Sequence, residues 1–178
     1  MPASIDPRIV AVSAHGAHAF SKPNRLSIRL VEGHGIEGDA HAGPTMKDRG
    51  QVVPNIRQVH LIHSELFDEL AGRGFVVSAG VIGENITTAG LDLLTLPVGT
   101  RLHLGGEAVI ELTGLRAPCS QVEKFAKGLL YELAHKEDGR ICIKSGVMSV
   151  VIAAGDVHPG DPIRVELPSE PHRELRPV

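Results

Sequence analysis

Glycine and proline recur along this chain so often that long uninterrupted helices and strands are disfavoured. The 178 residues include 20 glycines and 12 prolines, whereas aromatic side chains make up only 3%. Glycine supplies the positive backbone angles that tight turns need, and proline cannot donate a hydrogen bond inside a helix or sheet. We therefore expect many short strands joined by turns.

Short apolar and alternating segments fit this expectation. Gly105 and Gly106 separate two of them and predict a hairpin. Apolar residues at helical spacing predict one helix at 64–71 and a longer amphipathic helix from Ser120 to about His135. Strands are predicted at 8–12, 26–31, 59–62, 85–88, 101–104, 108–112, 148–154 and 162–165.

The order of these elements predicts the fold class. Strands outnumber helices and do not alternate with them regularly, which disfavours a parallel α/β sheet. We predict a mainly β domain, a closed or nearly closed β-barrel with a few peripheral helices. The length fits a single domain at residues 1–167 with its own core, followed by a polar tail at 168–178 that we expect to be mobile.

Charge and hydropathy exclude some classes of partner. The 18 basic and 21 acidic residues give a net charge of −3, so no general attraction to nucleic acid or anionic lipid is expected. No segment approaches the roughly 18 consecutive apolar residues of a membrane span, and the first residues do not resemble a secretion signal. We predict a cytoplasmic protein in which Cys119 and Cys142 are free thiols.

The sequence GHGIEG at residues 33–38 has the glycine spacing of a dinucleotide-binding loop. That loop requires a helix starting within the motif, so that the helix N-terminus meets the pyrophosphate. Here the chain continues as DAHAGP, which is typical of a loop. We therefore interpret the match as accidental.

Cys119 is the strongest candidate for chemistry. It follows Pro118 at the turn before the predicted second helix, where helix N-terminal amides favour a thiolate, and Arg116 adds positive charge nearby. The alternative is a buried structural thiol, a common fate of cysteine. Cys142 lies between β-branched residues in an alternating pattern and is interpreted as structural.

The segment around Cys119, LTGLRAPCSQ at 112–121, resembles the MOSC domain, which is named for the C-terminal part of molybdenum cofactor sulfurases. Other segments resemble the same family in the same order. They are GIEGDAHAG at 35–43, GENITT at 83–88, and PGD at 159–161. Together these matches run from about Lys22 to Val165.

This resemblance implies a barrel related to that of pyruvate kinase, and a molybdenum-pterin cofactor (Mo-molybdopterin). It also implies that Cys119 either ligates molybdenum or carries sulfur as a persulfide. Relatives include reductases of amidoximes and hydroxylamines, and domains fused to pyridoxal phosphate-dependent desulfurases. This chain has neither a fused desulfurase nor an iron-sulfur cysteine cluster. The expected partner is therefore a separate cysteine desulfurase or a separate electron-donor protein.

Further site residues follow from the resemblance. Lys22, Arg57 and Arg116 are candidates for binding the pterin phosphate, or are ordinary surface cations. Asp39 and His41 lie in a glycine-rich loop. There His41 could protonate a leaving hydroxyl, whereas Asp39 could equally only stabilise the turn.

Four polar residues near these segments complete the candidate site. Glu84 and Asn85 could bind pterin ring nitrogens or satisfy nearby backbone groups. Thr113 and Gln121 flank the thiol segment and are expected to orient it rather than to react.

Three functions therefore stay open: a molybdenum-dependent reductase of N-hydroxylated compounds, a sulfur transferase acting through Cys119, and a non-catalytic cofactor-binding or storage module. A zinc hydrolase is a weaker alternative. The histidine pairs 15/18 and 60/63 do not have the spacing of a helical zinc motif, and the chain contains no C-x-x-C sequence.

Overall fold

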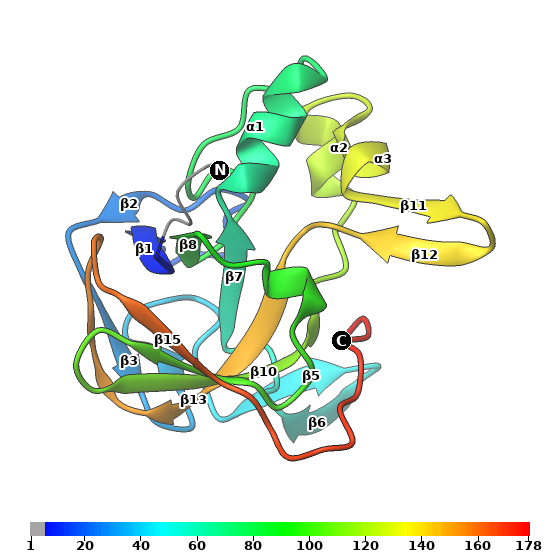
Figure 1. Ribbon diagram of the computed structural model, residues 1–178. Coiled ribbons are helices and arrows are strands. Elements are labelled where there is room, and N and C mark those ends of the chain that lie inside the picture. Colours follow the sequence, from blue (N-terminus) through cyan, green and yellow to red (C-terminus); the bar gives the residue numbers. More distant parts are fainter. Residues whose placement is uncertain (1–5) are drawn as a thin grey trace.

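The computed structural model describes residues 6–178, and strands dominate it (Figure 1). The predicted mainly β class is confirmed. The largest sheet has eight strands. In spatial order they are β15 (Ile163–Glu166), β9 (Arg101–Leu104), β10 (Ala108–Leu115), β13 (Val147–Ala153), β7 (Val59–His63), β8 (Ile86–Ala89), β1 (Arg8–Ser13) and β2 (Asn24–Arg25).

Smaller sheets and short helices surround this sheet. The additional strands are β3 (Ile28–Val31), β4 (Gly35–Ile36) and β14 (Gly155–Val157) in one sheet, and the hairpins β5 (Thr45–Asp48) with β6 (Gln51–Pro54) and β11 (Ala134–Glu137) with β12 (Arg140–Ile143). The helices are α1 (Glu65–Gly72), α2 (Gln121–Phe125), α3 (Leu129–Leu133) and the 3₁₀ turn η1 (Leu93–Thr95). In Figure 1 the three α-helices gather at one end of the molecule.

Neighbouring strands of the large sheet pair antiparallel, except β7 and β8, which are parallel. The hairpin predicted at Gly105 and Gly106 is confirmed between β9 and β10. The strand order is open, although a single bridge joins Arg8 to Pro162 and the Ile9 amide donates to the Asp161 carbonyl at 2.9 Å. A fully closed barrel therefore stays a prediction.

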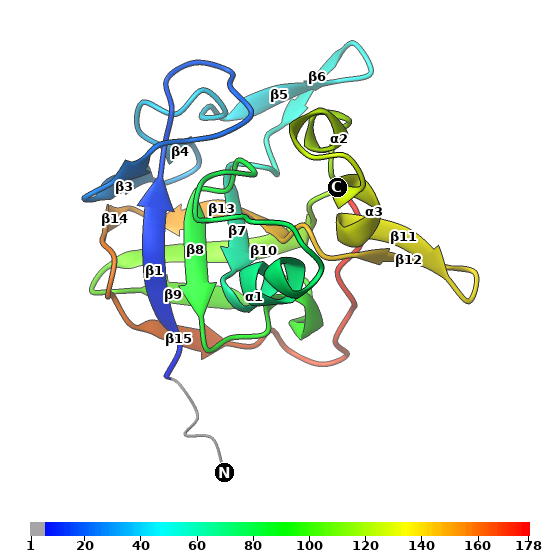
Figure 2. The ribbon, with the colours of Figure 1, turned by 90° about the horizontal axis from the view of Figure 1, so that it is seen from above.

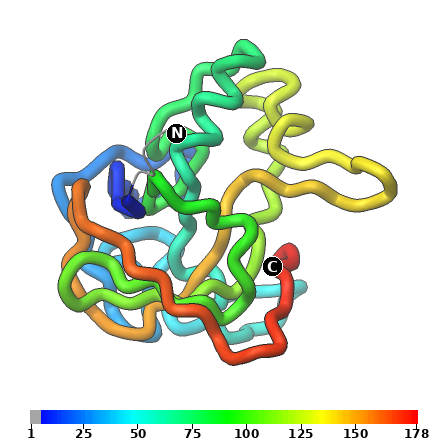
Figure 3. The backbone as a smooth tube through the Cα atoms, in the orientation of Figure 1, coloured from blue at the N-terminus to red at the C-terminus, as the bar shows by residue number. Residues whose placement is uncertain are grey.

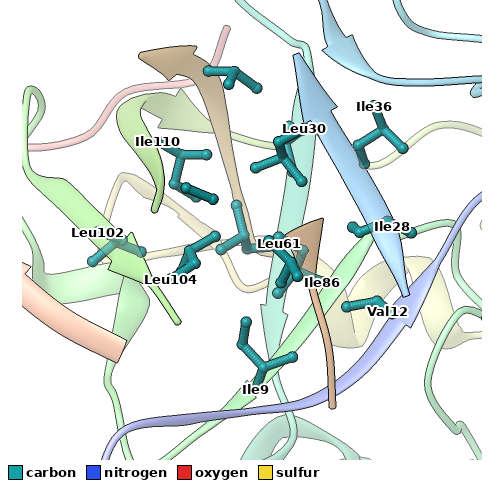
Figure 4. Close-up of a cluster of buried hydrophobic side chains, with 14 of the residues drawn as sticks. Ile9, Val12, Ile28, Leu30, Ile36, Leu61, Ile86, Leu102, Leu104 and Ile110 are labelled. Atoms are coloured by element: carbon teal, nitrogen blue, oxygen red, sulfur yellow. The ribbon is translucent and has the colours of Figure 1, made fainter. Parts of the chain in front are cut away.

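The main core lies against the inner face of the large sheet (Figure 4). Residues of β10 alternate between buried and half-buried, as a strand with one face in the core requires. Figure 2, which looks along a perpendicular direction, shows β1, β8 and β7 side by side in this sheet. The core side chains are aliphatic and include Ile9, Leu30, Leu61, Ile86, Leu102, Leu104 and Ile110.

A second apolar cluster lies beneath the helices and joins Leu66 and Leu70 of α1 to Val122 and Leu129. The prediction of one helix from Ser120 to about His135 is wrong. The chain instead forms α2 and α3, and then enters β11. The break spans residues 126–128: Ala126 is extended, and Gly128 has a left-handed φ of 88°, which a residue without a Cβ adopts readily.

The prediction of a mobile tail at 168–178 is also wrong. Leu175 is buried, and the Val98 amide donates to the Arg173 carbonyl at 2.9 Å. Figure 3 follows these last residues, in red, back along the body of the molecule. The polar composition suggested a free segment, but the tail docks through its backbone, which composition does not report.

Candidate functional site

A cavity of about 570 Å³ is lined by residues of β5, β7 and α2, among others. Segments distant in sequence form its wall, including the loop before β5, strand β7 and the segment that precedes α2. Its polar lining residues are His18, Lys22, His41, Thr45, Lys47, Asn55, Arg57, His60, Asn85, Arg116, Gln121 and Ser145, together with Cys119.

The Cys119 thiol lies in this wall and is partly exposed. Its Sγ is 3.8 Å from Oε1 of Gln121, a weak hydrogen bond. Helix α2, which follows the thiol, has only five residues, whereas the sequence predicted a long helix there. Cys142 lies on β12 and is not part of the cavity wall.

Besides Lys22, three cations in the wall face the same cavity: Lys47, Arg57 and Arg116. In the part of the chain that the structure describes, none of them forms an ion pair with a carboxylate. Burial lowers the pKa of Arg116, the thiolate charge of Cys119 opposes this shift, and the Arg57 charge adds to it. The arrangement favours an anionic ligand, because an anion would offset the mutual repulsion of these cations.

Asp39 lies behind the wall and organises its charged side. Lys22 Nζ is 3.0 Å and 3.1 Å from the two carboxylate oxygens, and the side chains of this pair are only 5% and 1% exposed. The His41 amide and Asn85 Nδ2 also donate to Asp39, at 3.0 and 3.2 Å. Burial alone would raise the pKa of Asp39, but the hydrogen bonds from His41 and the Lys22 charge outweigh it and hold that pKa well below its usual range.

The hydrogen bonds and ion pair around Asp39 affect how Lys22 and His41 can interact with a ligand. Because Asp39 neutralises Lys22, that ammonium attracts an anion less than Arg57 or Arg116 does. His41 is half exposed and lines the cavity, and its Nδ1 is 3.4 Å from Asp39 Oδ1. A histidine that contacts a carboxylate through one ring nitrogen and is open to the cavity has the geometry of a proton donor or acceptor.

His60 and Ser145 belong to the wall but were not predicted from the sequence. His60 is buried, and its Nε2 lies 2.7 Å from the Ser145 carbonyl. Burial, followed by the nearby Arg116 charge, lowers the pKa of His60 to about 3, so this ring is neutral near pH 7. The available signal was a single polar residue within an apolar strand at 59–62.

Asn55 was also missed, and it fixes the loop that carries His41. Its Nδ2 donates to the carbonyls of His41 and Gly43, both at 3.0 Å, while its Oδ1 accepts from the Arg57 amide at 3.0 Å. One buried side chain thereby joins the histidine and the arginine on the same side of the cavity.

Glu84 and Thr113 are not among the wall residues. Glu84 is fully buried and accepts from the Gly80 amide at 2.6 Å and from the Thr87 hydroxyl at 3.1 Å, and burial raises its pKa. The Thr113 hydroxyl donates to the Ile56 carbonyl at 2.7 Å. Both contacts fit local structural roles.

The structure therefore brings most of the predicted site residues together, although it does not test their roles. Asp39 stands directly behind the wall. Those in the wall itself are Lys22, His41, Arg57, Asn85, Arg116, Cys119 and Gln121.

Two features are absent from the described residues, 6–178. No group of three or more histidine, cysteine, aspartate or glutamate side chains converges as a metal site would require. No helix in this range combines the length and apolar character needed to cross a bilayer.

Known structures share this fold. The YUAD protein from Bacillus subtilis is 22% identical, with a TM-score of 0.79 over 93% of this chain and 98% of that chain. YiiM from Geobacillus stearothermophilus is 18% identical, with a TM-score of 0.66 over 94% and 79% of the two chains. YiiM from Escherichia coli is 21% identical, with a TM-score of 0.64 over 93% and 73%.

Sequence comparison identifies the family. Comparison with curated proteins gives no significant match. A family model described as the MOSC domain, however, matches residues 37–164, which is most of the chain and includes Asp39, Asn85 and Cys119. The resemblance stated from the sequence is confirmed, and this chain belongs to the MOSC domain family.

Proposed function

We propose that the cavity binds the molybdenum-pterin cofactor, with Cys119 as a ligand to the metal, and that the protein acts in the reduction of N-hydroxylated compounds. One observation carries the proposal: a free thiol and the guanidinium groups of Arg57 and Arg116 share one cavity. Its volume of about 570 Å³ lies within the usual range of ligand sites.

The residues present fit such a group. A thiolate is a soft ligand suited to metal-sulfur centres, and one cysteine suffices where a dithiolene supplies the other sulfur atoms. The guanidinium groups of Arg57 and Arg116 suit a phosphate, because their planar donors can bind its oxygens in pairs. Apolar side chains of the wall, including Phe20, Ile82 and Met148, suit a flat ring.

In this proposal each residue has a limited task. When bound, the cofactor would supply the two-electron chemistry that cleaves an N–O bond. Cys119 holds it, Arg57 and Arg116 orient its phosphate, and Asn85 contributes a polar edge to the wall. Cleavage of an N–OH bond to N–H and water consumes two electrons and two protons, with the electrons coming from a separate donor protein.

His41 is the proposed source of a proton for the leaving hydroxyl. Its ring is half exposed, lines the cavity and is braced by Asp39, so it can exchange protons with solvent between turnovers. His60 is the less suitable donor, because its pKa of about 3 leaves it without the second proton near neutral pH.

A second candidate is sulfur transfer, in which Cys119 accepts a persulfide from a cysteine desulfurase. The partial exposure of the thiol and its single weak hydrogen bond favour this possibility. Mass spectrometry after incubation with a desulfurase and cysteine should then show added sulfur on Cys119. Sulfur on Cys142 alone, or on neither thiol, would count against this candidate.

Reconstitution tests the reductase proposal. The chain, loaded with cofactor and supplied with a reducing protein, should convert amidoximes, hydroxylamines or N-hydroxylated purines to the reduced products. Cys119→Ser should abolish this conversion, whereas Cys142→Ser, which changes the other thiol outside the cavity, should keep it. If cofactor-loaded protein reduces none of the three substrate classes, the result would favour a non-catalytic cofactor-binding module.

A further inference from the structure

The segment that carries Cys119 begins where strand β10 ends at Leu115. Residues 116–120 have no regular secondary structure, and α2 begins at Gln121. A loop of this kind directs its thiol only if its first residues are held in one direction. The backbone contacts of Leu115 and Arg116 therefore decide where Cys119 points.

The turn between β12 and β13 holds Arg116 from one side. The Arg116 amide donates to the Gly146 carbonyl at 2.9 Å, and the Ser145 hydroxyl donates to the Arg116 carbonyl. The turn is itself anchored, because the Ser145 carbonyl lies 2.7 Å from His60 Nε2. Gly146 has a φ of +91°, and a Cβ there would meet the Leu61 carbonyl at 2.1 Å, so the turn cannot shift toward β7.

The C-terminal residues hold Leu115. The Leu115 amide donates to the Arg176 carbonyl at 2.8 Å, and the Val178 amide donates to the Leu115 carbonyl at 3.2 Å. Gly114 makes this approach possible, because a Cβ there would lie 2.5 Å from the Arg176 carbonyl oxygen. Leu175 is buried in the main core and fixes the tail at its other end.

We propose that Ser145, Arg176 and Val178 are positioning residues for Cys119. Arg176 and Val178 occupy the amide and the carbonyl of Leu115, and Ser145 occupies the carbonyl of Arg116, whose amide donates to Gly146; these contacts keep the thiol in the cavity beside Arg116. This proposal rests on the proposed function, because a residue that ligates a metal must be held in place. The position of the thiol can nevertheless be measured without any cofactor.

The test is the rate at which iodoacetamide alkylates Cys119 as a function of pH, in a Cys142→Ser background so that one thiol reacts. Gly114→Ala displaces the tail, and Ser145→Ala removes the hydroxyl bond. The matched controls are Gly155→Ala, where a Cβ would meet the Ala108 amide nitrogen at 2.6 Å near the start of β10, and Ser149→Ala, which removes a hydroxyl bond to the Val59 carbonyl.

We expect Gly114→Ala and Ser145→Ala to change the alkylation rate at pH 7 by about threefold to tenfold, because loss of a hydrogen bond of about 1 kcal/mol lets the thiol loop move relative to the cavity wall. Their rates should differ from the parental rate across the whole profile, because the released thiol no longer lies against the cavity wall. The controls should lower the melting temperature while keeping the parental profile. If Gly114→Ala does not fold, a chain lacking residues 176–178 removes both backbone bonds to Leu115.

Parental alkylation profiles in both variants, with melting temperatures lowered as in the controls, would overturn the proposal and leave the tail and Ser145 as general stabilisers. This result differs from a failure of the proposed function. A chain that never binds the cofactor would still show the altered alkylation profile if these residues position the thiol.

Discussion

The two faces of strand β7 bury different chemistry. Val59 and Leu61 lie on one face, within the aliphatic main core, where each is fully buried. On the other face, Ile62 packs in the second apolar cluster, whereas His60 lies in the cavity wall among a buried ion pair and unpaired cations. Burial of aliphatic groups stabilises a fold without needing partners, whereas burial of charged and polar groups costs stability unless each finds one.

The difference indicates which face serves folding and which serves binding. The main core needs only volume and apolar surface, so any aliphatic set of the right size would serve. The cavity wall retains Lys22 and His60, and Asp39 lies directly behind it; an apolar replacement would avoid the burial of these polar groups. A wall of this kind is expected where a ligand, rather than stability, selects the residues.

The largest expected effect comes from breaking the buried ion pair between Lys22 and Asp39. Lys22→Met leaves the Asp39 carboxylate buried without its ammonium, and should lower the free energy of unfolding by about 3–5 kcal/mol in urea titrations. Adding Asp39→Asn should restore more than half of this loss. Arg29→Met, which breaks the exposed pair with Asp156, should cost about 1 kcal/mol or less. Equal losses in the two single variants would contradict the account.

The next largest effect is expected in the aliphatic main core. Leu61→Ala should lower the free energy of unfolding by about 3 kcal/mol, because it removes buried methyl groups and leaves a void in the main core. The matched control is Leu26→Ala, since Leu26 is 93% exposed, and its unfolding curve should overlay that of the parent. The cofactor affinity of folded Leu61→Ala should remain unchanged. A large loss of affinity would mean that the two faces are coupled.

A smaller effect is the loss of folding stability at acid pH that protonation of His60 causes. The pKa of His60 is about 3 in the folded chain, whereas an unfolded histidine has a pKa of about 6.5. At a pH between these two values, the unfolded chain therefore binds one more proton than the folded chain. The stability from the neutral ring is present above pH 6.5 and is lost as the pH falls toward 3. It should amount to about 2 kcal/mol between pH 7 and pH 5.

Thermal unfolding at pH 7 and pH 5 measures this difference. His60→Gln should show a smaller fall in melting temperature than the parent. His172→Gln, which changes an exposed histidine bonded to the Pro168 carbonyl, should fall as the parent does. An unchanged pH dependence in His60→Gln would show that the ring is not held neutral.

Much of the sheet could be predicted from the sequence because its strands alternate or are uniformly apolar. The predicted range 101–104 coincides with β9, and 8–12 differs from β1 by one residue. The hairpin of β5 and β6 was missed because its residues are largely exposed and show no core pattern. The helix break at Gly128 was missed because helical spacing continues across it.

The candidate site was accessible to sequence reasoning only in part. Cys119 and Arg116 were found from their position just before a predicted helix, and His41 was found because its segment has a family resemblance. His60 and Ser145 lie in segments without such a resemblance, and they meet only because β7 and β13 are neighbours in the sheet. The role of the tail depends on backbone bonds to Leu115, which no side-chain pattern reports.

The most direct test of the central claim is the molybdenum content of the chain purified from a molybdenum-replete host that makes the pterin cofactor. We expect close to one molybdenum per chain in the parent and in Cys142→Ser, and a large loss in Cys119→Ser. Parent protein free of molybdenum, or Cys119→Ser protein with the parental content, would contradict the claim that this thiol holds the metal in the cavity.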